Sequence, residues 1–165
     1  MAQTDQAEIA EQIRAFGVNL RRARQGAGLT QAGLSSAAPI DRAAISRLEC
    51  GERAPDLPTL LRVCTALSIE PMVLLHDIGS KTSIDHRPLR VASPTRSPAA
   101  LFGANLKWAR TRVGISQERL ALDAKVDRAA ISVYENGGRE PNLRTVLKLA
   151  LKLKIRPDLL LRGIG

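Results

Sequence analysis

The chain has 165 residues, of which 44% are hydrophobic and only 2% aromatic, and its formal net charge is +9. The shortage of aromatic residues disfavours a β-sandwich, because strands prefer aromatic and β-branched side chains. The positive charge favours a polyanionic partner such as nucleic acid, although a basic surface is often only a solvated one. No long apolar run and no signal-peptide pattern is present, so we expect a reduced, cytoplasmic protein without a membrane partner.

The sequence contains almost the same unit twice. Residues 16–79 align with residues 102–165 without a gap at a constant offset of 86 positions (102 minus 16), and about 30 of the roughly 64 pairs are identical. A long gapless repeat of this kind indicates two copies of one folded unit. We therefore expect two tandem domains, 1–79 and 99–165, joined by a flexible linker over 80–98.

The linker is rich in Ser, Thr, Pro and Arg and shows little apolar periodicity. A flexible chain of about 20 residues has a root-mean-square span of about 25 Å and stretches to about 65 Å. Ile84, Leu89 and Val91 leave open a short strand or docking segment within it.

Apolar periodicity predicts helices throughout both copies. The first helix should run from Thr4 or Asp5 to about Gln25, and its counterpart should end near Arg112. Pro39 should disfavour helical geometry at the residue before it. Pro71 and Pro157 should each open a short fifth helix. The N-cap residues expected before the second, third and fourth helices are Thr30 and Ser116, Asp41 and Asp127, and Asp56 and Asn142.

The second and third helices of each copy, with their short turn, form a helix-turn-helix, whose second helix can enter the DNA major groove. The residues from Leu29 to Leu34 and from Ile45 to Leu60, and their counterparts from Ile115 to Thr145, closely resemble the lambda-repressor/Cro-like (Xre-type) helix-turn-helix family. The resemblance implies an all-α fold of two tandem five-helix DNA-binding domains. The resemblance further implies a bacterial protein of the cytoplasm that is associated with the nucleoid.

The resemblance also implies roles for the matching residues. Gln31 and Gln117 match a glutamine that contacts phosphate and braces the recognition helix. The positions that usually reach bases are Arg42, Ala43 and Arg47 in the first copy and Arg128, Ala129 and Val133 in the second. Secondary contacts are Ser46 and Ser132, and loop residues near the DNA backbone are Arg53 and Arg139. Independently, arginine can donate to guanine O6 and N7, whereas Ala or Val can meet a thymine methyl. The alternative is that these arginines only solvate a helix face.

These features predict a sequence-specific transcriptional regulator, a repressor, that reads two half-sites of double-stranded DNA with its two recognition helices. A homodimer or a regulatory protein partner is possible. In the alternative, one domain binds DNA while the other mediates dimerisation or binds a protein, as in an antitoxin or antirepressor. An enzyme is not expected, because His76 and His86 lie at a domain end and in the linker, away from any nucleophile or base set.

No cofactor or metal is expected, since Cys50 and Cys64 lack the spacing of a zinc site and Cys64 falls on an apolar helical face. Trp108 stands where the first copy has Arg22, on the expected solvent side of a first helix. An exposed tryptophan is an interface candidate, with an incidental surface position as the alternative.

Overall fold

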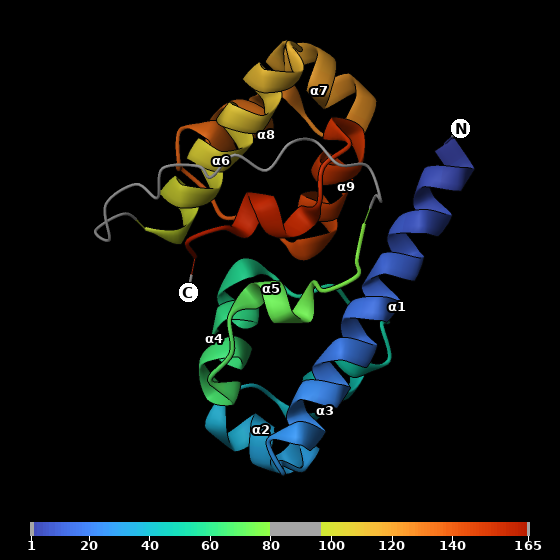
Figure 1. Cartoon of the computed structure of the whole chain (residues 1–165), viewed down its shortest axis with the longest axis vertical. Helices are drawn as coiled ribbons and strands as arrows, with labels where there is room; N and C mark the ends of the chain where they lie inside the picture. Colours follow the sequence, from blue (N-terminus) through green and yellow to red (C-terminus); the bar gives the residue numbers. More distant parts are fainter. Residues whose placement is uncertain (1, 80–96, 165) are drawn as a thin grey trace. The chain divides into compact units, whose positions relative to one another are not determined.

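The computed structural model describes residues 2–79 and 97–164, which fall into two compact units whose main division lies between Ile78 and Gly79 (Figure 1). The predicted linker over 80–98, with its open question of a short strand, lies outside the described residues except for Ser97 and Pro98. Ser97 caps a helix that begins at Pro98, and its hydroxyl accepts a hydrogen bond from the Ala100 N–H.

Every regular element in these two ranges is a helix, which confirms the all-α prediction. The first unit contains α1 (Ala2–Gly26), α2 (Gln31–Ala37), α3 (Arg42–Glu49), α4 (Leu57–Leu67) and α5 (Pro71–Leu74). The second contains α6 (Pro98–Val113), α7 (Gln117–Ala124), α8 (Arg128–Glu135), α9 (Leu143–Leu153) and the 3₁₀ helix η1 (Pro157–Leu161). Pro71 and Pro157 thus each open a fifth helix as predicted, which is an α-helix in the first copy and a 3₁₀ helix in the second.

Side chains at the predicted caps start the short helices that follow the turns. The Thr30 hydroxyl accepts from the Gly33 N–H at 3.0 Å, and the Asp41 carboxylate accepts from the Ala43 and Ala44 N–H groups at 2.8 and 3.2 Å. Such bonds satisfy N–H groups that have no partner within the helix. The same arrangement recurs where Asp56 caps α4, Ser116 caps α7 and Asp127 caps α8.

A small residue brings the first helix of each unit against the end of the recognition helix. A Cβ placed on Gly17 would lie 2.5 Å from the Glu49 carbonyl oxygen, so α1 and α3 approach each other closely there. Gly103 meets the Tyr134 carbonyl oxygen in the same way. Only glycine tolerates this approach, and both copies have it. The fully buried core beneath includes Phe16, Leu20, Leu34 and Ile45, with Phe102, Leu106, Leu120 and Ile131 at the equivalent positions.

An asparagine in each first helix holds the chain after the fifth helix. Asn19 Nδ2 donates to the carbonyl oxygens of Leu74 and His76 at 3.1 and 3.0 Å. Asn105 Nδ2 makes the equivalent bonds, at 3.2 and 3.0 Å, to the carbonyl oxygens of residues 160 and 162. Both units are therefore closed by the same side chain at the same place.

The turn between α2 and α3 ends the second helix where expected. Helix α2 stops at Ala37, and Ala38, the residue before Pro39, has φ −98° and ψ 7°, outside α-helical geometry as predicted. The turn closes through a hydrogen bond from the Ile40 N–H to the Ser35 carbonyl oxygen at 3.1 Å. In the second unit Lys125, the C-cap of α7, adopts left-handed geometry at φ 50°.

Candidate nucleic-acid interface

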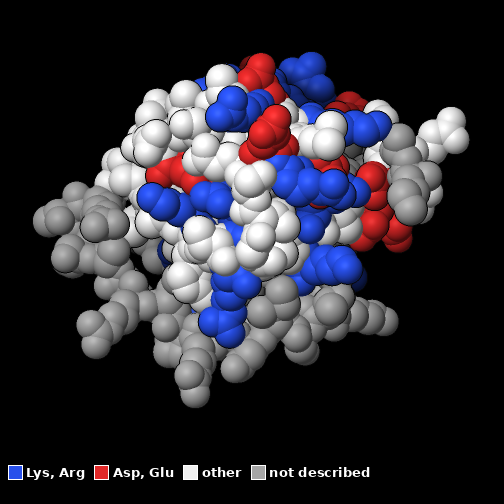
Figure 2. All heavy atoms as spheres, turned by 90° about the horizontal axis from the view of Figure 1, so that it is seen from above, with Lys and Arg blue, Asp and Glu red and all other residues white. Residues whose placement is uncertain are grey.

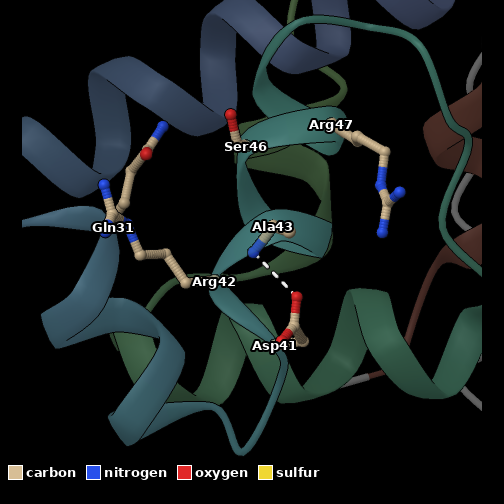
Figure 3. Close-up of a pocket in the computed structure, with 6 residues that line it drawn as sticks. All are labelled: Gln31, Asp41, Arg42, Ala43, Ser46 and Arg47. Carbon is tan, nitrogen blue, oxygen red and sulfur yellow. Dashed lines mark hydrogen bonds between the residues drawn. The ribbon is translucent and has the colours of Figure 1, made fainter.

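Helix α3 presents polar side chains on one side and its apolar residues on the other. Arg42, Ala43 and Arg47 are exposed and Ser46 is half-buried, whereas Ile45 and Leu48 are buried as predicted. Arg42 and Arg47 leave α3 on opposite sides in the view of Figure 3, with Ala43 between them. An open hollow on this surface is lined by Gln31, Asp41, Arg42, Ala43, Ser46 and Arg47.

Helix α8 repeats this surface with one change. Arg128 and Ala129 are exposed and Ser132 is half-buried, while the apolar side is buried against the unit. Val133, which replaces the second arginine, leaves 41% of its surface exposed. The two predicted reading surfaces therefore share their first residues and differ near the last turn of the helix.

A buried ion pair ties the recognition helix of the first unit to the helices before it. The Arg24 guanidinium, from α1, donates through Nε and Nη2 to the two Glu49 carboxylate oxygens at 2.5 and 3.0 Å. Gln31 Nε2, from the first turn of α2, donates to Glu49 Oε2 at 3.0 Å. Arg24 Nη1 also donates to the Leu29 carbonyl at 2.7 Å. One carboxylate at the end of α3 thus joins three helices.

The second unit contains the same network. Arg110 donates through Nε and Nη2 to Glu135 at 2.6 and 3.0 Å, Gln117 Nε2 donates to Glu135 at 2.7 Å, and Arg110 Nη1 donates to the Ile115 carbonyl at 2.8 Å. Both carboxylates are almost completely buried. We call each set of Arg, Gln and Glu side chains the buried triad.

Charge partners determine the protonation of the buried triads. Burial raises the pKa of Glu49 and Glu135, but hydrogen bonds from the arginine and glutamine outweigh it and hold each pKa below its ordinary value of 4.5. The hydrogen bond to the carboxylate, against an opposing effect of burial, raises the pKa of Arg24 and Arg110. Each triad is therefore ionised at neutral pH.

Sequence reasoning placed Gln31 and Gln117 at this point but missed the arginine and glutamate of each triad. The arginine and the glutamate of each triad lie 25 positions apart in the chain, so no local sequence pattern joins them. The available signal was their identity in both copies, since all three side-chain types recur at the repeat offset. The amide nitrogen of each glutamine donates to the buried carboxylate. In the first unit Gln31 also lines the same hollow as Arg42, at the start of the recognition helix (Figure 3).

The remaining predicted residues lie at the surface. Arg53 and Arg139 are exposed in the loops that follow the recognition helices. Trp108 is only half-buried, and the guanidinium carbon of Arg112 lies 5.4 Å from its ring centroid, in range of a cation–π contact. Cys50 is exposed, whereas burial raises the pKa of the Cys64 thiol to about 12, which keeps it protonated and unreactive as expected.

Comparison with known proteins gives helix-turn-helix matches in both units. A family model described as "Helix-turn-helix domain" matches residues 15–73, and one described as "Helix-turn-helix" matches residues 106–160. The transcriptional regulator ClgR of Mycobacterium tuberculosis is 31% identical over 88 residues, which are 53% of this chain and 79% of that protein. The chain belongs to the helix-turn-helix family of transcriptional regulators. It is a tandem pair of Xre-like units.

Other helix-turn-helix relatives match over one unit. The SPbeta prophage-derived uncharacterized regulator YonR of Bacillus subtilis is 41% identical over 63 residues, and the uncharacterized regulator YqaE of the same organism is 33% identical over 63 residues. The chain spans little more than half the length of these two relatives, 58% and 54%. The solved structure of the restriction-modification controller protein C.AhdI from Aeromonas hydrophila is 37% identical over 38% of this chain and 94% of that one, with a TM-score of 0.37.

Charged side chains of both signs are mixed on the face of the molecule that Figure 2 shows. Lys and Arg side chains lie there among Asp, Glu and uncharged residues rather than in one unbroken patch. Within residues 2–79 and 97–164, no group of three or more His, Cys, Asp or Glu side chains could hold a metal ion. No helix in these ranges is long and apolar enough to cross a membrane. The candidate interface is therefore defined by the recognition helices and their triads.

Proposed function

We propose that the chain is a sequence-specific DNA-binding repressor that places α3 and α8 in the major groove of two half-sites. One observation carries the proposal: the same outward residues, Arg-Ala followed by Ser, recur on two recognition helices, each held by an identical buried triad. An exposed surface with no function would not need the same residues twice, because solvated positions tolerate substitution. Other exposed positions have changed between the copies, as at Ser36 and Leu122 or Cys50 and Asn136.

The chemistry of the exposed residues suits this role. The Arg42 and Arg128 guanidinium groups can each donate to guanine O6 and N7, and the Ala43 and Ala129 methyls can meet a thymine methyl. Ser46 and Ser132 lie on the same face for secondary contacts. Arg53 and Arg139, in the loops, are placed for phosphate contacts that fix orientation without reading sequence. Gln31 and Gln117 are proposed to brace the recognition helices and to lie near the phosphate backbone of the DNA.

Two half-sites can be served by one chain. Half-sites of a helix-turn-helix dimer lie about 34–36 Å apart. The proposed domains, 1–79 and 99–165, are separated by about 20 residues, which reach about 65 Å when fully extended. One chain can therefore occupy both half-sites, as the two subunits of a dimer would. We place this binding in the cytoplasm, on the nucleoid. Binding of a second chain at the same DNA site is also compatible with the proposal.

Selection of bound sequences from a random duplex pool tests the proposal, followed by titration of the selected site at several salt concentrations. We expect a defined bipartite site and an affinity that falls steeply with salt, because Lys and Arg release counterions from phosphates. A reporter gene with the site in its promoter should be repressed. Failure to enrich any sequence, or a salt dependence near zero, would remove the DNA-reading function.

A second candidate function has one specific observation in its favour. In the second unit Leu122 is 70% and Val133 41% exposed, where the first unit has Ser36 and Arg47. An apolar pair would suit a protein partner, with only the first unit on DNA, as in an antitoxin or antirepressor. Under that alternative Arg42→Ala would abolish specific binding and Arg128→Ala would leave it unchanged. Equal losses would assign both units to DNA.

A further inference from the structure

The loop after each recognition helix is hydrogen-bonded to the reading position in which the two copies differ. The Glu52 N–H donates to the Arg47 carbonyl at 3.0 Å, and the Gly138 N–H donates to the Val133 carbonyl at 2.9 Å. Because the bond is the same in both units, the third residue after the helix lies against its last turn in each. We call positions 52 and 138 the loop neighbour of the reading residue.

The direction of a side chain at the loop neighbour follows from the glycine in the second unit. A Cβ built on Gly138 would lie 3.3 Å from Val133 Cγ1 and 3.5 Å from the Val133 carbonyl oxygen. A side chain there is therefore directed at the reading side chain. The same backbone bond in the first unit holds the Glu52 main chain against the last turn of α3 at Arg47, and the side chains of both residues are exposed.

The loop neighbour and the reading residue change together between the copies. Where the reading residue is a cation, Arg47, the neighbour is an acid, and where it is apolar, Val133, the neighbour has no side chain. A carboxylate near DNA phosphates is unfavourable unless it interacts with a cation. Glycine in the second unit avoids that cost and leaves the valine room.

We propose that Glu52 is a positioning and specificity-determining residue of the first reading surface, acting through Arg47. This inference rests on the proposed DNA-reading function. The carboxylate attracts the guanidinium and repels nearby phosphates, so it disfavours the non-specific arrangement in which Arg47 bonds to the backbone. The guanidinium then remains available to a base edge, which raises the ratio of specific to non-specific binding rather than the affinity itself.

The first experiment compares Glu52→Gln with Glu70→Gln in the full chain. Both remove one negative charge from the first unit, and Glu70 is exposed and makes no side-chain bond at its helix cap. Glu52→Gln should bind non-cognate duplex about two- to fivefold more tightly, the range of an exposed charge pair, and selection should relax at the base faced by Arg47. Glu70→Gln should retain the wild-type base preference. Equal behaviour of the two variants in both readouts would overturn the proposal.

The second experiment rebuilds the pair in the second unit. Val133→Arg, Gly138→Glu and the double variant are compared, with Gly138→Ala as the control for size. The double variant should prefer guanine at that base about two- to fivefold more than Val133→Arg alone, whereas Gly138→Glu alone should weaken all binding without changing preference. If the effect of the double variant on base preference equals the sum of the two single effects, the proposed interaction between positions 133 and 138 is rejected. Trp108 fluorescence reports whether each variant folds, and the Glu52 comparison decides the matter if one does not.

The two proposals fail in different ways. If wild-type protein enriches no sequence, the proposed function fails whatever the loop variants do. If wild-type protein selects a site but Glu52→Gln matches its control, the DNA-reading function stands and only the role of Glu52 is rejected.

Discussion

The two units agree where side chains hold helices together and at the outward Arg-Ala-Ser residues of α3 and α8, but they differ at many other outward positions. The buried triads, the asparagine that closes each unit, and the glycine between the first and third helices are identical in kind and bonding. By contrast, the turn residue, the last reading residue and its loop neighbour all differ: Pro39 and Lys125, Arg47 and Val133, Glu52 and Gly138. The internal ties fix where α3 and α8 lie in their units, and under the proposed function the outward residues determine which bases each helix reads.

The cores also differ in detail while keeping this frame. In the second unit Phe102 and Tyr134 pack edge to face with ring centroids 6.0 Å apart, and the first unit has Phe16 and Leu48 at the equivalent positions. Surface residues differ too, since the Arg119–Asp123 ion pair on α7 replaces Gly33 and Ala37. Core side chains and surface helix residues therefore differ between the two copies while the triad is retained. The triad tolerates less change between the copies than these positions do.

The largest expected effect is on stability, from breaking a triad. Glu135→Ala leaves a buried guanidinium without its charge partner, which should lower the free energy of unfolding of the second unit by about 3–5 kcal/mol. Urea denaturation followed by Trp108 fluorescence measures this, because the chain has one tryptophan, in that unit. Glu118→Ala, which removes an exposed acid of α7, is the matched control and should change stability little.

The equivalent change in the first unit sharpens the comparison. Glu49→Ala should reduce the helical circular dichroism signal at lower urea while leaving the Trp108 transition in place. If Trp108 reports the same shift for both variants, the units unfold together and cannot be treated as independent.

Acid should weaken both triads. The folded pKa of Glu49 and Glu135 is depressed, so their contribution is fully present above the unfolded value of 4.5 and is lost as the pH falls through the lower folded value. The free energy of unfolding should therefore decline below pH 4.5, and the double Glu49→Gln, Glu135→Gln variant should show a flatter decline. An unchanged pH profile in that variant would mean that the pKa values of Glu49 and Glu135 do not differ between the folded and unfolded states.

Local chemistry made most of this fold predictable. Thr30, Asp41 and Asp56 are strong caps whose hydrogen bonds depend on residues two or three positions away, so the sequence was sufficient to place α2, α3 and α4. The outward direction of Arg42 and the inward direction of Ile45 follow from helical spacing in the same way. The base contacts of these residues stay predictions.

Contacts between distant residues were not predictable locally. Arg24 and Glu49 meet only because α1 and α3 pack, and neither residue type indicates burial by itself. Trp108 was expected to be exposed, but Arg112 covers part of its ring. Its role at an interface stays a prediction.

The next largest expected effect is on DNA binding, from loss of an arginine that is proposed to read a base. Arg42→Ala and Arg128→Ala should each cost about 1–3 kcal/mol of binding free energy and relax preference at one base pair. Arg139→Ala should instead weaken binding to all sequences alike, because phosphate contacts do not read bases. Fluorescence anisotropy on the selected site and its single-base variants distinguishes these outcomes. An Arg128→Ala protein with wild-type affinity and preference would remove the second unit from the reading surface.

The smallest effect, and the most direct test of the comparison, concerns one base pair in the selected site. Arg42 with Ala43 and Arg128 with Ala129 should read the same bases, whereas Arg47 favours guanine and Val133 offers only apolar contact, best suited to a thymine methyl. A single chain on both half-sites should therefore select an imperfect repeat that differs at this position. Val133→Arg should move selection toward symmetry, by about 1 kcal/mol at that base. A symmetric wild-type site that is indifferent to this substitution would mean that two chains each contribute the same unit, because only identical readers produce identical halves, and the single-chain arrangement would then be abandoned.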